Sequence, residues 1–428
     1  MEEVESRLSS LSEERDRFFE VHHGKTLEDR QRFVKEAALR LLEEVPICSS
    51  VESSKARHSY MSGRILNCPF EYDARCEELL VKAVKLDPAL VEAWNELGDC
   101  LWKKPDRGGA IRCFQTALNK KRNGRALRCL SIAMRQEAAS CSKGSAKEKM
   151  RESLRLAEEA ASLDPLDHES WYVLGNGYLT YFFASNQQQQ ENLTKALDSY
   201  RKALEVTQGP SCNADLHFNF AQALKFEQSY AEALTHLSRS VSLDPHFGAA
   251  TDSLRCLSSF LLRVDEAVRR KGRLKAKRLR QLVEELSHLD SGSGKPWPKS
   301  GSLPLRSTTE LLEVPNSKGE GNDNSVLVAK VVAVVPNLEV IPYCFVGVEA
   351  DQRCFACCVY NFADGFGVCI GNSVSILRPK IVRVTAQVES QPVGFACVRV
   401  MTPEALAVNG RVVPKSAVAA CDAVVTPS

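Results

Sequence analysis

The chain has 428 residues, which is long enough for two or three domains that each bury a core. Lysine and arginine number 56 and aspartate and glutamate 54, so the overall charge indicates no electrostatic partner, which has to be sought in local clusters. The acidic start, Met1 to Glu5, does not resemble a secretory signal, and no run reaches the roughly 18 apolar residues of a membrane span, so we expect a cytoplasmic or nuclear protein without a membrane partner.

Residues 1–56 are predicted to form N-terminal capping helices. Within them, residues 1–46 have the apolar spacing of two amphipathic helices that are acidic overall. A cap of this kind covers the open apolar face at the start of a repeat array.

Two later segments begin alike and predict a helical repeat. Trp94 and Trp171 are each followed by Leu-Gly at the W-x2-L-G spacing that starts a tetratricopeptide repeat. Three Asp-Pro pairs are predicted to stop second helices: Asp87-Pro88, Asp164-Pro165 and Asp244-Pro245. Residues 57–247 are therefore interpreted as five repeats, with bounds near 57–90, 91–124, 125–167, 168–213 and 214–247. The third and fourth are irregular, and the fourth contains a polar insertion with Gln187 to Gln190.

Three further segments follow the repeats. Residues 248–289 are predicted to be two capping helices, and residues 290–324 form a linker rich in Ser, Gly and Pro. In residues 325–428 the pattern changes to short β-branched runs. The predicted strands are 326–335, 343–348, 354–361, 373–377, 381–388 and 395–400. The fold class is thus an α solenoid of tetratricopeptide repeats followed by a small β-barrel, for which an OB-fold is the first choice.

No pattern indicates catalysis or a cofactor, so the chain is predicted not to be an enzyme. Most of the 16 cysteines, such as Cys76, Cys113 and Cys369, lie among apolar residues and are expected to be small buried side chains. Cys354 and Cys357 form a Cys-x-x-Cys pair, but side chains three apart on a strand point to opposite faces, so no metal site is predicted.

Candidate binding residues come from the concave groove of the solenoid, which is lined by positions 2, 5, 6, 9, 12 and 13 of each first helix. Asn176 is at position 9 of the fourth repeat and Asn219 at position 6 of the fifth. An asparagine amide offers both a donor and an acceptor to an extended peptide backbone. The alternative is that both asparagines bridge helices locally.

Two charged residues extend this groove. Asp215 is at position 2, where chaperone-binding repeats carry lysine, and Tyr172 replaces a second such lysine, so a clamp for a C-terminal carboxylate is disfavoured. An acidic residue there suits a basic side chain or an N-terminal amine, although Asp215 could also be a helix cap with Asn213. Arg135 could pair with an acidic ligand side chain, or only stabilise the end of its helix.

A basic cluster occupies Arg269–Arg280, where eight of twelve residues are Lys or Arg. Leu279, Leu282, Val283 and Leu286 keep a helical stripe, so the charges are expected on one exposed face. Such a face fits the phosphate backbone of ribosomal RNA. A nuclear localisation signal over residues 275–278 and a merely solvated face are the alternatives.

Several of these segments resemble the tetratricopeptide repeat protein 5 (Strap) family. They are the runs at residues 83–88, 91–95, 170–172 and 215–217, and the order of parts agrees from Phe19 through the β-domain. The resemblance implies an adaptor that recognises the N-terminal residues of nascent tubulin at the ribosome and promotes decay of tubulin mRNA. An alternative role known for the family is that of a transcription cofactor in stress responses.

The resemblance also implies roles for particular residues. Arg135 and Asp215 match groove residues that contact the tubulin peptide, which begins Met-Arg-Glu, while Lys275, Lys277 and Arg278 match residues that contact the ribosome, including ribosomal RNA. The implied partners are this peptide, the ribosome, an mRNA-decay adaptor and, for the alternative role, transcription coactivators. The insertion near 184–192, the linker and the first 50 residues depart from the family pattern and leave the decay adaptor in doubt.

Overall fold

The computed structural model describes residues 2–45, 52–141, 143–184, 190–207, 211–291, 303–313, 324–339, 342–363 and 365–419. Most of the predicted linker and the run Gln187 to Gln189 lie outside these ranges. The chain divides into two compact units, one with residues 1–223 and 238–248 and the other with residues 224–237 and 249–422. Each unit is described by itself.

The first unit begins with three helices, α1 (Glu2–Asp16), α2 (Phe18–Val21) and α3 (Leu27–Glu43), one more than the sequence indicated. A capping box starts α3, since the hydroxyl of Thr26 accepts a hydrogen bond from the amide of Asp29 and the Asp29 carboxylate accepts one from the amide of Thr26. The apolar stripes of α1 and α3 meet in a core that includes Leu8, Val34 and Leu41. The N-terminal helices therefore pack together around a common core at the start of the first unit.

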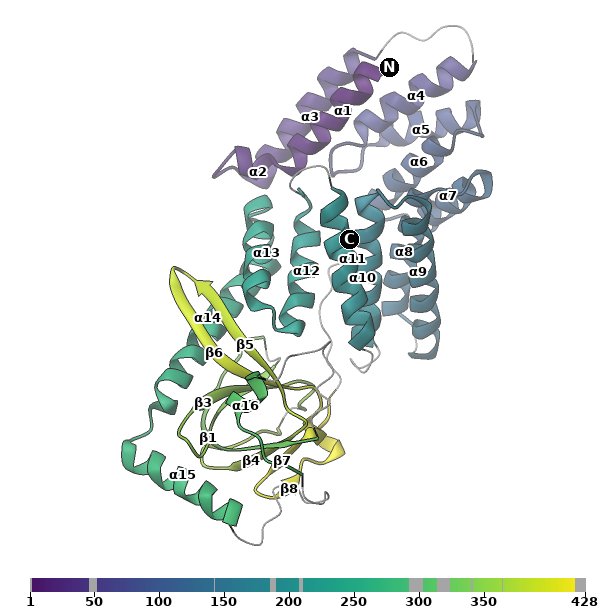
Figure 1. The fold of residues 1–428 in the computed structure, drawn as a ribbon. Coiled ribbons are helices and arrows are strands. Elements are labelled where there is room, and N and C mark those ends of the chain that lie inside the picture. The colour runs from purple at the N-terminus through teal and green to yellow at the C-terminus, as the bar shows by residue number, and fades with distance from the viewer. Residues whose placement is uncertain are drawn as a thin grey trace. The chain divides into compact units, whose positions relative to one another are not determined.

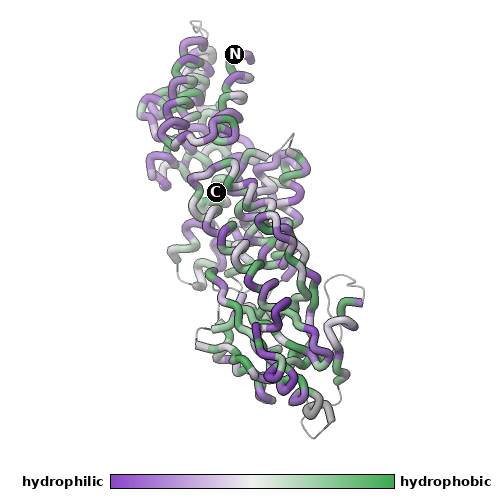
Figure 2. The backbone as a smooth tube through the Cα atoms, turned by 90° about the vertical axis from the view of Figure 1, so that its left-hand side faces the viewer, coloured by the Kyte–Doolittle hydropathy of each residue, from purple (hydrophilic) through white to green (hydrophobic). Residues whose placement is uncertain are grey.

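Ten helices follow as five successive pairs (Figure 1). The pairs are α4 (Glu52–Leu66) with α5 (Ala74–Leu86), α6 (Val91–Lys103) with α7 (Arg107–Lys120), α8 (Gly124–Ala139) with α9 (Lys143–Leu163), α10 (His168–Ala184) with α11 (Gln190–Val206), and α12 (Ala214–Glu227) with α13 (Tyr230–Leu243). Hydrophilic and hydrophobic residues alternate along these helices (Figure 2), as expected for helices that bury one face.

Small residues at position 8 let the two helices of a pair approach closely. A Cβ atom on Gly98 would lie 2.5 Å from the Phe114 ring, and one on Gly175 would lie 2.7 Å from the Tyr200 ring. In the third pair Ser131 takes this place, because its hydroxyl bonds the carbonyl oxygen of Ser153 on α9 at 2.8 Å. The third repeat therefore keeps the close approach without the glycine that the motif requires.

Hydrogen bonds link the Asp-Pro turns that end second helices to the tryptophans near the start of the next first helices. Asp87 ends α5, and its carboxylate accepts a hydrogen bond from the amide of Ala89 at 3.0 Å. The indole of Trp94 then donates to the carbonyl oxygen of Pro88 at 3.0 Å, and Trp171 does the same to Pro165 at 2.9 Å. Each tryptophan thus fixes the start of a first helix to the turn that ends the preceding repeat.

The N-terminal helices also contact the end of the last repeat within this unit. Glu20 of α2 forms an ion pair with Arg239 of α13, and Arg30 of α3 lies 3.6 Å from the carboxylate of Asp244. The ring of Phe19 packs against His246 with centroids 5.1 Å apart. The two ends of the repeat array are thus joined by charged and aromatic contacts.

The second unit contains helices and one sheet. Its helices include α14 (Gly248–Arg269), a 3-10 turn (Lys271–Arg273), α15 (Ala276–Ser291) and α16 (Thr308–Glu313). The strands are β1 (Val326–Val335), β2 (Tyr343–Val348), β3 (Cys354–Val359), β4 (Ser373–Leu377), β5 (Lys380–Val388), β6 (Gln391–Val400), β7 (Leu406–Val408) and β8 (Arg411–Val412). The sequence located the first six and missed the short β7 and β8.

The strands form one sheet in the order β5-β6-β3-β2-β1-β4-β7-β8. Strand β3 pairs with β6 in parallel, and the other pairs are antiparallel. The sheet curls around a core that includes Phe345, Phe355 and Ile376, and β5 and β8 remain at its two ends (Figure 1). The predicted small OB-fold domain is therefore present, but its barrel is not closed.

Helices of this unit are tied to the sheet by polar contacts. The carboxylate of Glu285 on α15 accepts from Lys330 of β1 at 2.7 Å, and the carboxylate of Asp265 on α14 accepts from the amide of Gly394 at 3.1 Å. Unit 249–422 thus groups residues that the sequence analysis placed in a cap, a linker and a β-domain. Those boundaries remain a proposal.

Two further observations concern membrane-spanning helices and the burial of cysteines. Among the described residues, no helix is both long and apolar enough to cross a membrane. Cys76 and Cys113 are buried as expected, whereas Cys369 is exposed. The expectation for Cys369 was wrong because Val368 to Asn372 forms a turn between β3 and β4 and not part of a strand.

Candidate functional site

The four predicted peptide-binding residues come from three first helices of the solenoid: Arg135 from α8, Asn176 from α10, and Asp215 and Asn219 from α12. Asn176 and Asn219 are both fully buried. The Asn219 amide donates to the Asn176 side-chain oxygen at 3.2 Å, and that oxygen also accepts from the hydroxyl of Tyr200 at 2.7 Å. The local bridge between helices, which the sequence left open as an alternative, is therefore formed.

Tyr172 lies between the asparagines and the charged residues. The Asn219 amide is 3.4 Å from its hydroxyl. Burial raises the pKa of Tyr172, the negative charge of Asp215 raises it further, and the positive charge of Arg135 opposes this rise. Because both charges act on one phenol, Arg135 and Asp215 both lie near the hydroxyl group of Tyr172.

Arg135 is held by neutral oxygen atoms. Its guanidinium donates to the carbonyl oxygen of Val173 at 3.2 Å and to the hydroxyl of Ser131 at 3.4 Å. Burial lowers the pKa of Arg135 to about 10, so the group stays charged at neutral pH. A charged guanidinium can form charge-assisted hydrogen bonds with an anionic ligand group.

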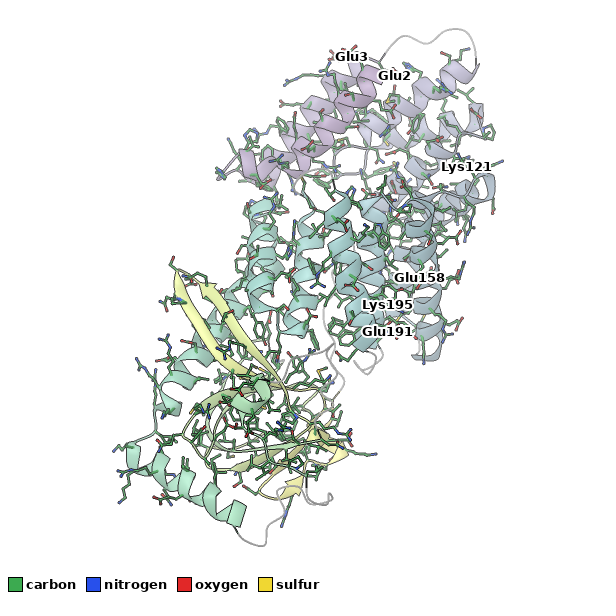
Figure 3. The ribbon with its side chains drawn as sticks, in the orientation of Figure 1. Glu2, Glu3, Lys121, Glu158, Glu191 and Lys195 are labelled. Carbon is green, nitrogen blue, oxygen red and sulfur yellow. The ribbon has the colours of Figure 1, made fainter. Side chains whose placement is uncertain are left out.

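Asp215 is half-buried in the first turn of α12. The capping role that was open for this segment is filled by Asn213, whose side-chain oxygen accepts from the amide of Leu216 at 2.8 Å. Another side of α10 contacts α9, since the hydroxyl of Tyr178 donates to Glu158 at 2.7 Å; Glu158 is labelled on α9 in Figure 3. Helix α10 thus presents Tyr172 to the candidate site and Tyr178 to α9.

A cavity of about 430 Å³ adjoins this site and contains residues that sequence reasoning missed. Its wall includes Asp99 of α6, Arg125 and Arg128 of α8, and Glu169, Tyr172 and Val173 of α10. If Ser131 is counted as position 8 of the third repeat, Arg125 and Arg128 fall at positions 2 and 5 of that repeat. Asp99 falls at position 9 of the second repeat, and Glu169 falls at position 2 of the fourth. The same position count could have found them, had Ser131 been recognised in place of glycine.

The predicted RNA-contacting residues lie at the start of α15. Lys275, Lys277 and Arg278 are exposed, while Leu279 and Leu282 of the same helix are buried. The expected division into a basic and an apolar face is therefore confirmed. We call Lys275, Lys277 and Arg278 the basic surface.

Other basic residues of the Arg269–Arg280 cluster form ion pairs with nearby acids. Arg269 pairs with Asp265, and Arg273 pairs with Glu266, both acids of the preceding helix. Within the described residues, the three side chains of the basic surface have no carboxylate within ion-pair distance, and Arg278 bonds only the amide oxygen of Gln281 at 2.9 Å. Unlike Arg269, Arg270 and Arg273, the basic surface is therefore not neutralised by an ion pair with these acids.

Comparison with known proteins identifies the family. Over 411 residues the chain is 34% identical to tetratricopeptide repeat protein 5 of Homo sapiens, covering 96% of this chain and 93% of that protein. The chain belongs to the tetratricopeptide repeat protein 5 family. It is also 35% identical to the Mus musculus member of this family over 400 residues, which cover 93% of this chain and 90% of that protein.

Two other comparisons concern the parts of the chain. The family model described as the tetratricopeptide repeat protein 5 OB fold domain matches residues 313–422. The crystal structure of YrrB, described as a tetratricopeptide-repeat protein with an unusual peptide-binding site, is similar at a TM-score of 0.32 and 18% identity, over 52% of this chain and 99% of that chain. The family model thus agrees with the OB-fold assignment, while the helical repeats rest on the helix pairs of this structure itself.

Proposed function

We propose that this chain is a peptide-binding adaptor, without catalytic activity, that recognises the N-terminal residues of nascent tubulin at the ribosome and promotes decay of tubulin mRNA. Its place in the tetratricopeptide repeat protein 5 family supports an adaptor role in protein interaction. The partners in this proposal are a peptide beginning Met-Arg-Glu, the ribosome with its RNA, and an mRNA-decay adaptor, and the site of action is the cytoplasm.

The opposite charges of Asp215 and Arg135, which both act on the hydroxyl group of Tyr172, support this proposal. Successive side chains of an extended peptide point to opposite sides, so an Arg-Glu pair presents its two charges in opposite directions. Asp215 suits the arginine and Arg135 suits the glutamate. Asn176 and Asn219 are proposed to hold the peptide backbone, which requires their mutual hydrogen bond to open because both side chains are buried in the absence of a ligand.

Calorimetry with a synthetic peptide beginning Met-Arg-Glu tests this assignment. Asp215→Arg and Arg135→Ala are each expected to weaken binding on the order of 100-fold, because each removes the partner of a desolvated charge. Asp198→Arg on α11 is the matched control, since that side chain is 67% exposed and pairs only along its own helix. Unchanged affinity in both groove variants would contradict the proposal.

The exposed basic surface also supports a second candidate, a nuclear transcription cofactor whose basic residues serve import and whose partners are transcription coactivators. A variant with Lys275, Lys277 and Arg278 all changed to glutamate separates the two. Loss of co-sedimentation with ribosomes favours the first function. Loss of nuclear signal with intact co-sedimentation favours the second.

A further inference from the structure

Tyr172 is close to every residue that the proposed function assigns to peptide binding. It belongs to α10, is 4% exposed, and forms part of the wall of the cavity of about 430 Å³. The charges of Asp215 and Arg135 both act on its hydroxyl group. This hydroxyl group therefore lies near the two side chains that are proposed to bind the charges of the peptide.

The hydrogen bonds of Tyr172 leave the proton of its hydroxyl group available. The hydroxyl oxygen accepts a hydrogen bond from the side-chain amide of Asn219 at 3.4 Å. Among the described residues, no oxygen or nitrogen atom accepts a hydrogen bond from this hydroxyl group. Because a phenol is a donor as well as an acceptor, its proton can be given to water or to a ligand.

The two asparagines beside Tyr172 are already bonded within the protein. The side-chain oxygen of Asn176 accepts from the amide of Asn219 at 3.2 Å and from the hydroxyl of Tyr200 at 2.7 Å. A contact between these amides and a ligand requires a buried hydrogen bond to open, whereas a hydrogen bond donated by Tyr172 requires no such change. A group that is preorganised in this way contributes more of its hydrogen bond to affinity.

The chemistry of this donor favours a neutral acceptor. Burial raises the pKa of Tyr172, and the negative charge of Asp215 raises it further, so the hydroxyl group is protonated at neutral pH. A neutral donor that lies near one anion and one cation has no net preference for a charged acceptor. Every residue of a peptide carries a neutral acceptor, its main-chain carbonyl oxygen.

We propose that the hydroxyl group of Tyr172 donates a hydrogen bond to a main-chain carbonyl oxygen of the bound peptide. The inference rests on the proposed peptide binding and deepens it, because it adds a main-chain contact to the two charged contacts. An extended chain advances about 3.3 Å per residue. A hydrogen bond at one carbonyl therefore fixes the register in which the arginine and the glutamate of the peptide meet Asp215 and Arg135.

A double-mutant cycle by calorimetry tests this inference on the full chain. The ligands are ten-residue peptides beginning Met-Arg-Glu: one is unmodified, and in three others sulfur replaces the carbonyl oxygen of the first, second or third residue, which makes that group a weaker acceptor. Each peptide is titrated into the wild type, Tyr172→Phe and Tyr178→Phe. Tyr178 is the matched control, because it lies on the same helix, is 9% exposed and donates its hydroxyl proton to Glu158.

Tyr172→Phe is expected to weaken binding of the unmodified peptide about 3- to 10-fold, as for the loss of one neutral hydrogen bond, and Tyr178→Phe is expected to leave it unchanged. At least one of the three sulfur-containing peptides should bind the wild type more weakly than the unmodified peptide and lose little more in Tyr172→Phe. Unchanged affinity in Tyr172→Phe overturns the inference, and so does full additivity for all three peptides.

A second variant keeps the test open if Tyr172→Phe fails to fold. Replacement of Tyr172 by 3-fluorotyrosine keeps the hydroxyl group and makes it a stronger donor. This variant is expected to bind the unmodified peptide at least as tightly as the wild type does. Weaker binding would overturn the inference.

Failure of the proposed function has a different signature. If the wild type does not bind the unmodified peptide, or if Asp215→Arg leaves binding unchanged, the peptide-binding function is rejected and the inference with it. If Asp215→Arg abolishes binding but Tyr172→Phe couples to none of the sulfur-containing peptides, only the hydrogen bond from Tyr172 is rejected.

Discussion

Arginines in the solenoid and basic residues on α15 are used in opposite ways. Arg125 and Arg128 are surrounded by carboxylates of neighbouring first helices, and Arg135 is held by neutral oxygens of α8 and α10. Lys275 and Lys277 are exposed beside a buried leucine stripe. The first set is fixed in place and suits a ligand of defined shape, whereas the second creates a field that suits a polyanion.

This difference depends on which residues surround each helix. In the solenoid, the charges at positions 2, 5 and 9 of adjacent first helices face one another, so acids and bases pair across the repeats. Asp265 and Glu266 of α14 pair with Arg269 and Arg273, and Glu285 of α15 pairs with Lys330. Among the described residues, no carboxylate is therefore left within ion-pair distance of the basic surface. The same residue types thus serve recognition by shape in one place and by charge in the other.

The largest expected effect is on RNA binding. Changing Lys275, Lys277 and Arg278 to glutamate is expected to weaken binding of a ribosomal RNA fragment by about 100-fold or more, because three phosphate contacts become repulsions. Filter binding at low salt measures this. The control changes Lys147, Arg151 and Arg155, three exposed basic residues of α9, to glutamate. An equal loss in the control would show that net charge alone matters.

The second largest expected effect is a difference in the salt dependence of ligand binding between the basic surface and the groove. Neutralising about three phosphates gives a loss of roughly 20- to 40-fold in RNA affinity between 50 and 200 mM salt. Peptide binding in the groove is expected to change only about 3-fold or less, because partly buried charges are screened weakly. Titrations of both ligands over this salt range check the contrast. Parallel salt dependences would remove the distinction drawn between the two regions.

The buried asparagine network is expected to contribute to stability. Asn176→Ala removes the acceptor of the Tyr200 hydroxyl and should lower the free energy of unfolding by about 1–3 kcal/mol. Tyr200→Phe is the paired variant, and the double variant should cost less than the sum of the two, because the Tyr200 hydroxyl is no longer left without an acceptor. Chemical denaturation measures each value. Strict additivity would mean that this hydrogen bond contributes nothing.

The smallest expected effect concerns the contact between the ends of the solenoid. Although burial opposes the shift, ion pairs with Arg239 and Arg17 lower the pKa of Glu20. The pair with Arg239 therefore stabilises the fold above the unfolded pKa of glutamate, about 4.3, and this contribution disappears as pH falls through the lower folded value. Glu20→Gln should lower stability by up to about 1 kcal/mol at pH 7 and by less near pH 3. Thermal unfolding at both pH values checks this, and a loss that is equal at both would contradict the ion-pair account.

The sequence predicted the helix pairs because their signals are local. A tryptophan, a small residue at position 8 and an Asp-Pro stop recur within one repeat, and each has its partner nearby. Ser131 hid the third repeat's groove positions because serine meets the same spatial need through a hydrogen bond. Strand β6 begins at Gln391 and not at residue 395 as expected, because its first residues pair with β5 in a hairpin.

Long-range partners could not be predicted from such signals. The bond between Asn219 and Asn176, and the ion pairs of Arg125 and Arg128, join residues of different repeats. The contacts of α14 and α15 with the sheet also depend on tertiary packing, and a pattern within one helix does not encode them. The candidate residues were therefore found singly, whereas their contacts with one another and the cavity beside Tyr172 were not.

The most direct test of the proposed function is a pull-down of ribosome–nascent-chain complexes. Complexes that display a tubulin N-terminus, or the same chain with its second and third residues exchanged, are incubated with the wild type and with Asp215→Arg. The account predicts that the wild type retains only the tubulin complexes and that Asp215→Arg retains neither. Equal retention of both nascent chains by the wild type would contradict it.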